Sequence, residues 1–415
     1  MINIIKETGL EQKFSYVIIT PYSIVKSRTG GLISRLLSRM DLELVGAQMM
    51  TPDEEFTREY AELIRYADPE NLNSGPELLA DYVLRNLGPS GGRKHRSLLL
   101  IFKGENPCDK LSQICGALFA KDMNEESIKI ESLNLESLHG ETIRDTYADL
   151  IYSSEDPNKI IYFEPAVLTP RRQAHVDQNL AVFARFLKKS ENIVQNMDYP
   201  DPSKIERTLV IIKPDNWQYA SSRPGAIIDM FSRTGLRIVG IKVHRFSLRQ
   251  ALDFYGPVAN NLKNKMAPAF GQKARETLEH EFKIPLNYHV EKALIESFGN
   301  EYAVEQFRKI IEFMSGVRPE LCPPEDIDKP GNVMCMILVY EGENAIQKIR
   351  DVLGPTDPLQ APGGTVRREF GSSVMVNTAH ASDSKESYER EKEIVRLNEN
   401  PLGDIISNYL INRTI

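Results

Sequence analysis

The sequence predicts an α+β protein made of two ferredoxin-like (βαββαβ) domains joined by a helical connector. The first observation is that short β-branched runs bounded by Pro or Gly, which are typical of strands, alternate with segments of helical apolar spacing. The second observation is that one succession of motifs occurs twice along the chain, which indicates an internal repeat. We therefore expect two copies of one sheet, each with helices packed against it.

The internal repeat sets the predicted domain boundaries. The paired segments are 16–21 with 209–214, 28–33 with 223–228, 44–46 with 238–240, 98–106 with 335–344, and 141–144 with 364–367. One domain is predicted in residues 1–165 and a second in residues 205–415. Residues 166–204 are predicted to form a helical linker, because they carry an apolar stripe of helical spacing that Pro200 and Pro202 interrupt.

The elements of the second domain follow from the local sequence. Strands are expected at 208–212, 237–246, 333–340 and 372–376, and helices at 225–232, 248–256, 302–315 and 345–352. Residues of about 257–300 contain a charged helical segment, and the family resemblance described below implies that they form an insertion. This insertion could be a lid or an assembly surface, but the sequence favours a solvated insertion, since surface insertions cost little free energy.

Composition and charge exclude several classes of protein. A chain of 415 residues with 41% hydrophobic content is long enough for two or three cores. The net charge of −7 argues against a protein that coats nucleic acid. The four cysteines show no C-x-x-C spacing, so neither a zinc site nor a disulfide framework is indicated. Because the sequence shows neither a signal peptide nor a membrane span, we expect a cytoplasmic protein.

One histidine stands in an unusual polar context. His380 lies in the stretch 377–384, where Asp383 is predicted to cap a following helix and Glu386 to complete a capping box. A histidine held in this way can be a base, a metal ligand or a nucleophile. Lys213, Arg350 and Arg367 are the candidate cations around it, and such a set suits a polyphosphate ligand better than a metal ion.

Residues of about 205–399 resemble a nucleoside diphosphate kinase. The matching stretches are 206–215, 223–228, 236–240 and 340–344, together with the residues around Arg367 and His380. The sequence departs from the family pattern at Ala381, where the family has glycine, and at Asn216, where it usually has glycine after the aspartate. The family has the ferredoxin-like fold, so the resemblance implies the same fold that the local sequence predicts.

The resemblance implies a kinase that moves the γ-phosphate of one nucleotide to another nucleoside diphosphate by a ping-pong mechanism. His380 would be the phosphorylated nucleophile, Glu391 would orient its imidazole, and Ser382 would belong to the same network. Tyr255 would lie beside the histidine, while Lys213 and Arg367 would stabilise the transferred phosphate. For Glu391, a solvated position in its charged helix remains the alternative.

The resemblance also assigns nucleotide-binding residues. Those expected to contact the nucleotide are Lys213, Phe307, Arg350, Thr356, Arg367, Val374 and Asn377. Phe307 and Val374 would sandwich the base, which predicts broad base tolerance. For Tyr255 and Phe307, packing in the helix core remains the alternative. Mg²⁺ would arrive with the nucleotide, close to Asp383, and not in a dedicated protein site.

The expected partners are nucleoside di- and triphosphates, with no membrane and no specific nucleic acid, and the family association predicts a homo-oligomer, most simply a dimer. The first domain is predicted to be inactive. Thr20 and Ser112 stand where Lys213 and Arg350 stand in the second copy, and Pro157 follows the retained Arg144 at the spacing of the histidine. We expect the first domain to dock on the second as an intrachain pseudo-dimer. The alternative function is a nucleotide-binding scaffold with little turnover.

Overall fold

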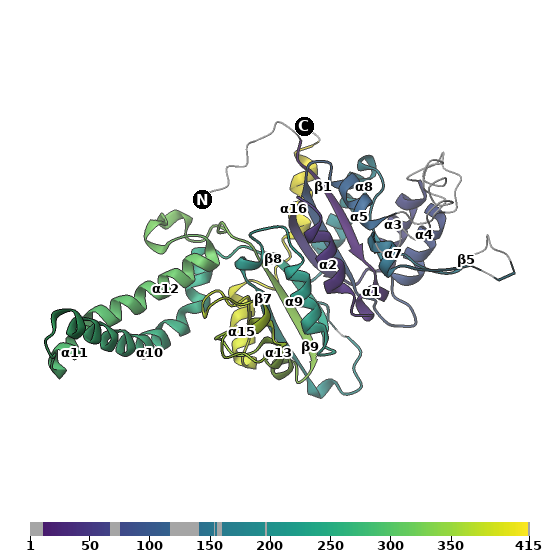
Figure 1. The fold of residues 1–415 in the computed structure, drawn as a ribbon. Coiled ribbons are helices and arrows are strands. Elements are labelled where there is room, and N and C mark those ends of the chain that lie inside the picture. Colours follow the sequence, from purple (N-terminus) through teal and green to yellow (C-terminus); the bar gives the residue numbers. More distant parts are fainter. Residues whose placement is uncertain are drawn as a thin grey trace, which may run out of the picture.

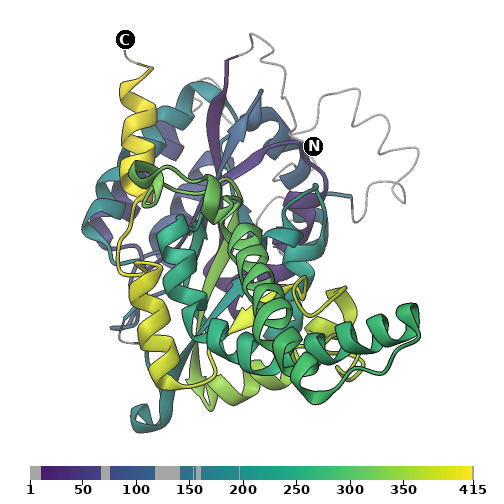
Figure 2. The same cartoon turned by 90° about the vertical axis from the view of Figure 1, so that its left-hand side faces the viewer.

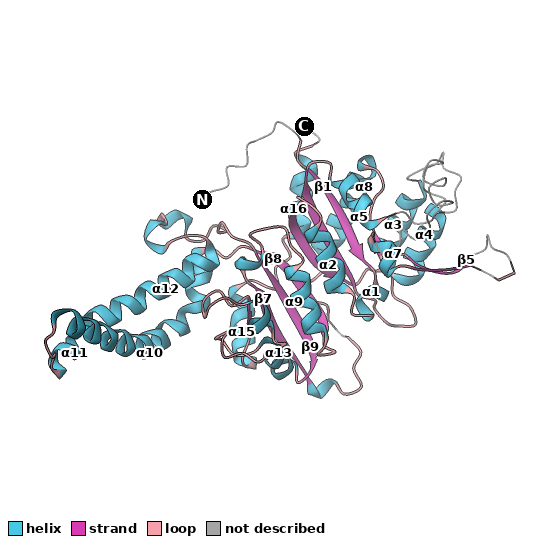
Figure 3. Cartoon of the chain, viewed as in Figure 1, coloured by secondary structure: helices cyan, strands magenta, loops and turns pink. Residues whose placement is uncertain are grey.

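The computed structural model describes residues 11–66, 75–116, 141–152, 154–155, 160–195 and 197–413. The chain is a mixed helix and sheet protein with two four-stranded antiparallel sheets, one in each half (Figures 1 and 3). Within the described ranges, no helix combines the length and apolar character that crossing a membrane would require.

The first half holds a sheet of strand order β2-β3-β1-β6. Its strands are β1 (Lys13–Ile19), β2 (Glu43–Met50), β3 (Ser97–Gly104) and β6 (Val167–Leu168). The helices are α1 (Pro21–Val25), α2 (Thr29–Ser38), α3 (Glu54–Tyr66), α4 (Gly75–Asn86), α5 (Pro107–Cys115), α7 (Ile143–Tyr147) and α8 (Gln173–Lys189). A separate hairpin pairs β4 (Asp149–Tyr152) with β5 (Ile160–Glu164).

The second half holds a sheet of strand order β10-β7-β9-β8. Its strands are β7 (Ile205–Ile212), β8 (Arg237–His244), β9 (Cys335–Glu343) and β10 (Ala379–Ala381). The helices are α9 (Arg223–Ser232), α10 (Leu248–Phe282), α11 (Tyr288–Leu294), α12 (Asn300–Ser315), α13 (Ala345–Leu353), α14 (Val366–Phe370), α15 (Lys385–Ile394) and α16 (Leu402–Ile411). When the strands of each half are counted in chain order, both sheets read second, third, first, last from one edge to the other.

Each central strand has a continuous apolar run in the part where both of its faces are covered. Leu209–Ile212 of β7 and the facing residues of β9 have no exposed surface, or almost none. Such continuous apolar runs are typical of strands buried on both sides. One cluster of buried apolar side chains extends through both halves, and a second cluster lies in the first half.

The insertion forms a helical arm that projects away from the sheets (Figures 1 and 2). The predicted helix at 248–256 continues without interruption to Phe282, and α12 packs back along it. The tip of the arm consists of α11 and a short π-helical turn at Ile295–Gly299. The first two turns of α10 remain at the sheet, where Phe254 and Tyr255 are buried.

Two local predictions near His380 are wrong. The last strand is β10, which contains His380, whereas the predicted strand at 372–376 is an irregular turn in which Val376 accepts hydrogen bonds from Ser372 and Ser373. The β-branched residues of that segment find no neighbouring strand, while His380 pairs with Ile211. The cap of α15 is Ser384, not Asp383, because the Ser384 hydroxyl accepts the hydrogen bond from the Ser387 amide.

The two halves pack through α2 against α9 and through β2 beside β8. Gly30 of α2 and Gly225 of α9 are paired in the predicted repeat, and they face each other. A Cβ atom on either glycine would overlap the carbonyl oxygen of the other. Absence of a side chain at both positions therefore allows the two helix backbones to approach closely.

Two segments inside the predicted linker, residues 166–204, pack with the first half. β6 pairs with β1, and α8 buries Val176, Leu180 and Phe183 in the first-half cluster. The C-terminal helix α16 also packs on α8, and its Leu402 and Ile406 enter the same cluster. The structure thus places residues 167–189, and the last helix of the chain, with the first sheet.

Candidate active site

A cavity of about 750 Å³ lies in the second half beside β10 and the base of the arm. The predicted site residues that line it are Lys213, Tyr255, Arg350, Thr356, Arg367, Val374, Asn377, His380 and Asp383. These residues come from separate stretches of the chain, and the fold brings them to one place. The predicted residues that do not line this cavity are Ser382, Glu391 and Phe307.

Glu391 lies directly behind His380. The imidazole Nε2 of His380 is 3.0 Å from Glu391 Oε1, and the Ser382 hydroxyl donates to Glu391 Oε2 at 2.7 Å. The Glu391 carboxylate is 4% exposed, so the alternative of a solvated helix face does not apply. Because an ionised carboxylate only accepts hydrogen bonds, this contact places a proton on Nε2 and leaves the lone pair on Nδ1.

Phe254 is a residue of this site that the sequence gave no reason to select. Its ring packs edge-on against the His380 imidazole, with ring centroids 5.1 Å apart. Phe254 is buried in the first turns of α10, one residue before Tyr255. Together with Glu391 it restricts the rotation of the imidazole. The only sequence signal was its apolar character at a core position, which most buried phenylalanines share.

Lys213 follows β7 and is almost fully buried. Its Nζ donates a hydrogen bond of 2.6 Å to Asn377 Oδ1, and its backbone amide donates to Thr378 O. Burial, with the positive charge of Arg367 nearby, lowers the pKa of Lys213 to about 7. A negative charge in the cavity would favour the charged ammonium and raise this pKa.

The two arginines differ in their attachment to the protein. Arg367 donates to Gly354 O at 2.9 Å and to Ala379 O at 3.1 Å, and burial beside Arg350 lowers its pKa to about 10. Arg350 is exposed, and its guanidinium makes no hydrogen bond or ion pair with any other described residue. Its guanidinium is therefore available to a ligand, whereas Arg367 also holds the loop that follows α13.

Asn377 fixes the loop between α14 and β10. Its amide nitrogen donates to Thr356 O at 3.1 Å and to Val374 O at 2.8 Å, while its oxygen accepts from Lys213. Asn377 is thus committed to protein partners. Thr356 and Val374 are both exposed at the cavity wall.

Tyr255 and Phe307, the two aromatic residues predicted to belong to the site, lie in different places. Tyr255 lines the cavity, and within the described residues its buried hydroxyl has no hydrogen-bond partner. Phe307 packs against the hydrophobic core instead, as the alternative for that residue stated. The residues of α12 that line the cavity are Ile310, Phe313 and Met314, since they face α10 near the base of the arm.

Acidic groups near the histidine are few. Among the described residues, no group of three or more His, Cys, Asp or Glu side chains could hold a metal ion. Asp383 lines the cavity, and its hydrogen bond from Ser387, with Arg350 and His380 nearby, lowers the pKa of its carboxyl. Asp351 is the other carboxylate among the residues that line this cavity.

In the first half, Leu168 occupies the position that His380 has in the second. Leu168 pairs with Ile18 on β1, just as His380 pairs with Ile211 on β7. The predicted counterpart, Pro157, lies outside the described residues, and the spacing from Arg144 does not locate the equivalent position because the β4–β5 hairpin lengthens this stretch. A leucine side chain offers no nucleophile.

Comparisons with known proteins cover the second half. The family model described as nucleoside diphosphate kinase matches residues 206–270 and 324–399. A nucleoside diphosphate kinase of Halorhodospira halophila is 31% identical over 189 residues, which span 46% of this chain and 91% of the relative. That of Nitratiruptor sp. is 30% identical over 187 residues, spanning 45% of this chain and 92% of the relative.

The solved structures that resemble this chain cover a similar fraction of it. The nucleoside diphosphate kinase of Aquifex aeolicus, in an orthorhombic crystal form, is 26% identical with a TM-score of 0.28. An NDP kinase from Pyrobaculum aerophilum is 25% identical with a TM-score of 0.31. Both matches cover 46% of this chain and 94% of the solved chain.

Proposed function

The chain belongs to the nucleoside diphosphate kinase family, and we propose that its second half transfers the γ-phosphate of a nucleoside triphosphate to a nucleoside diphosphate through His380. The observation that carries this proposal is the contact between His380 and the buried Glu391 at the edge of the cavity. A carboxylate that accepts the Nε2 proton holds one tautomer of the imidazole and supports the positive charge that develops on the ring during attack.

The proposed reaction consists of two matched steps. Nδ1 of His380 attacks the γ-phosphorus, the bond from that phosphorus to the bridging oxygen breaks, and the nucleoside diphosphate leaves. A second diphosphate then attacks the phosphohistidine with its terminal oxygen and regenerates the free imidazole. Since one site serves both nucleotides in turn, the kinetics are ping-pong.

Three cations supply the electrostatic part of the mechanism. Lys213, Arg350 and Arg367 line the cavity on the His380 side and face a transition state whose charge is spread over phosphate oxygens. Mg²⁺ that enters with the nucleotide would neutralise part of the phosphate charge, and Asp383 is the residue that would hold it through water. Loss of Arg367 by substitution with alanine is expected to cost on the order of 3 kcal/mol of transition-state stabilisation.

The base is proposed to lie on apolar side chains at the mouth of the cavity. Val374 lies on one wall, and Val258 and Phe313 come from the base of the arm. We therefore propose that Phe313, and not Phe307 as the sequence suggested, packs on the face of the base opposite Val374. Contacts of this kind hold any flat base with little reading of its edges, so broad tolerance among nucleobases is expected.

The first half is proposed to be an inactive copy of the same domain. Arg144 donates to Gly116 O and Val167 O, and Arg367 donates to the equivalent Gly354 O and Ala379 O. This correspondence and the shared strand order support a duplication. With Leu168 in place of the histidine and Thr20 in place of the lysine, the first copy would lack both the nucleophile and the buried ammonium.

The proposal is tested by incubating the full chain with γ-labelled ATP and a second nucleoside diphosphate. The chain should acquire an acid-labile, base-stable phosphate and pass it on, and His380→Ala should abolish both events while nucleotide affinity is retained. His289→Ala, on the exposed tip of the arm, is the matched control. Nucleotide binding without any label would favour the alternative, a nucleotide-binding scaffold.

A further inference from the structure

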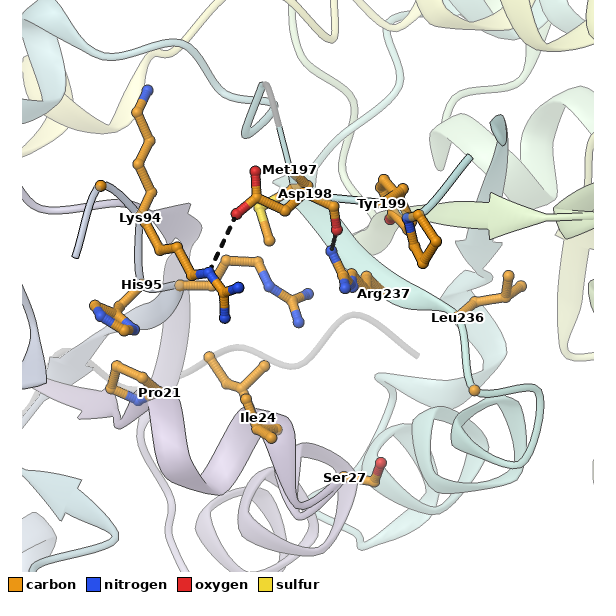
Figure 4. A pocket seen from close by; sticks show the side chains of 16 residues that line it. Pro21, Ile24, Ser27, Lys94, His95, Met197, Asp198, Tyr199, Leu236 and Arg237 are labelled. Carbon is orange, nitrogen blue, oxygen red and sulfur yellow. Dashed lines mark hydrogen bonds and ion pairs between the residues drawn. The ribbon is translucent and has the colours of Figure 1, made fainter. Parts of the chain in front are cut away.

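A second cavity, of about 900 Å³, lies between the two halves of the chain (Figure 4). The first half contributes α1 and the turn that precedes β3, residues 92–96. The second half contributes residues 235–237 at the start of β8, and the segment 197–200 closes the space between them. No residue of this cavity lines the His380 cavity.

The lining of this cavity is strongly basic. It contains Arg93, Lys94, Arg96 and Arg237, together with His95. Asp198 is the single carboxylate among the lining residues, and it forms an ion pair of 3.7 Å with Arg93. Even if this pair is treated as neutral, three permanent cations remain. The basic turn at 91–96 is thus part of the wall of a cavity and not only a solvated surface turn.

Arg96 and Arg237 are held without acidic partners. Arg96 donates to Ile238 O at 2.5 Å, and Arg237 donates to Asp198 O at 2.7 Å. Within the described part of the chain, neither guanidinium forms an ion pair, and Glu341, an acid whose charge acts on Arg96, is bound to Arg207 at 2.6 Å. Burial beside Arg237 lowers the pKa of Arg96 to about 10. Two neighbouring guanidinium groups with unfilled donor positions favour an anion between them.

The remaining wall is apolar and aromatic. Pro21 and Ile24 of α1 lie across the cavity from Asp198 and Tyr199, as Figure 4 shows. Leu236 extends the apolar surface on the side of the second half, next to Arg237. The guanidinium of Arg237 stacks on the Tyr199 ring at 4.2 Å, which keeps the charge in place. A cavity that has room for a ligand, several cations and an apolar wall suits a small organic molecule with a negatively charged end.

We propose that the cavity between the halves binds a small anion with two or more phosphate groups, which Arg93, Arg96 and Arg237 grip while Pro21 and Ile24 accommodate an organic moiety. Guanidinium groups bind phosphate oxygens in a bidentate way, and several such groups in one cavity select for a multiply charged ligand. Because both halves contribute residues, the bound anion links them. This site is independent of the proposed transfer reaction.

The experiment is isothermal titration of the full chain with inorganic tripolyphosphate and, separately, with a β,γ-imido nucleoside triphosphate. Both titrations use an Arg350→Gln background, which weakens anion binding in the His380 cavity. The double substitution Arg93→Gln and Lys94→Gln changes two exposed side chains, so the fold is retained. It should weaken tripolyphosphate binding roughly tenfold or more, and higher salt should weaken binding in the parent protein.

Arg85→Gln is the matched control, because Arg85 has the same 78% side-chain exposure as Arg93 and a similar ion pair, at 3.6 Å to Asp81. If the nucleotide analogue binds more tightly than tripolyphosphate, its organic moiety contributes to the affinity by contacting the apolar wall. If the two bind equally, the affinity comes from the phosphates alone. The proposal is overturned if the double variant binds both anions as tightly as its parent. An equal loss in Arg85→Gln would also overturn it.

Discussion

His380 Nε2 lies 3.0 Å from Glu391 Oε1, across the short distance between the last strand and the helix that follows it. The contact joins residues eleven positions apart, and it forms because β10 and α15 turn back on each other through Ser382 and Ser384. The carboxylate is buried and also accepts the Ser382 hydroxyl, so its direction is fixed. The geometry points one imidazole nitrogen at the protein and frees the other.

Glu391→Gln should lower kcat while leaving KM for the triphosphate nearly unchanged. A neutral amide supports the charge on the imidazole less well, and hydrogen bonds to charged groups contribute about 1.5–3 kcal/mol, which corresponds to roughly 10- to 100-fold in rate. Steady-state phosphate exchange measures the effect. Glu389→Gln, an exposed position on the same helix, should behave like the unaltered protein. A change in KM alone would contradict a role for Glu391 in orienting His380.

Binding of a polyphosphate should take up protons near pH 8 but not near pH 6. The pKa of Lys213 is lowered to about 7, so the free protein carries mostly neutral Lys213 at pH 8 and mostly charged Lys213 at pH 6. A bound anion favours the ammonium and raises this pKa. Titration calorimetry in buffers of different ionisation enthalpy measures the uptake. If Lys213→Met shows the same uptake at pH 8, another group is responsible.

Substitution of Arg350 should weaken nucleotide binding alone, whereas substitution of Arg367 should also lower the stability of the protein. Arg350→Gln should raise KM roughly tenfold or more, since it removes a charged donor, and should change stability by no more than about 0.5 kcal/mol. Arg367→Gln should lower both activity and Tm, because it also loses the hydrogen bonds to Gly354 O and Ala379 O. Lys348→Gln on the same helix as Arg350 is the control, since it lies outside the cavity lining. Equal Tm losses in both arginine variants would argue against this division.

Gly30→Ala should destabilise the contact between the halves. The added methyl group would overlap Gly225 O and the Asp229 side chain, and overpacking of this kind costs about 1–3 kcal/mol. Thermal unfolding and the rate of proteolysis between the halves measure the effect. Gly363→Ala adds a methyl group into open space and should leave both unchanged. An unchanged Tm for Gly30→Ala would show that α2 and α9 can move apart at little cost.

Ile406→Ala should destabilise the first half, although the residue lies near the C-terminus. Its side chain is fully buried in the first-half cluster, and loss of a buried isoleucine side chain costs about 2–5 kcal/mol. Ile411→Ala, 58% exposed on the same helix, should have little effect on Tm. For the same reason, a chain that starts near Ser203 should lose stability or solubility, because it exposes Leu402 and Ile406. Normal behaviour of that shortened chain would contradict the predicted docking of the halves.

Local sequence was sufficient for the parts of the molecule that depend on neighbouring residues. The apolar runs of β7 and β9 predicted strands because side chains buried on both faces must be apolar. The residues that line the His380 cavity were selected because their chemical types and order match one family. The insertion was located because the resembled family has far fewer residues between Tyr255 and the helix that contains Phe307. The strand predictions rest on short stretches, and the other two conclusions rest on the resemblance.

Tertiary structure decided what depends on a distant partner. Val374 and Val376 favour a strand by propensity, yet the strand forms at His380, where Ile211 offers a free edge. The packing of Phe254 on His380 could not be read from the sequence either, because an apolar residue on a helix is compatible with many neighbours. The same holds for α16, because its apolar residues do not indicate which half they contact, and the structure places Leu402 and Ile406 in the first-half cluster. Strand register and side-chain packing are set by the free energy of the whole assembly, so they appear only once the chain has folded.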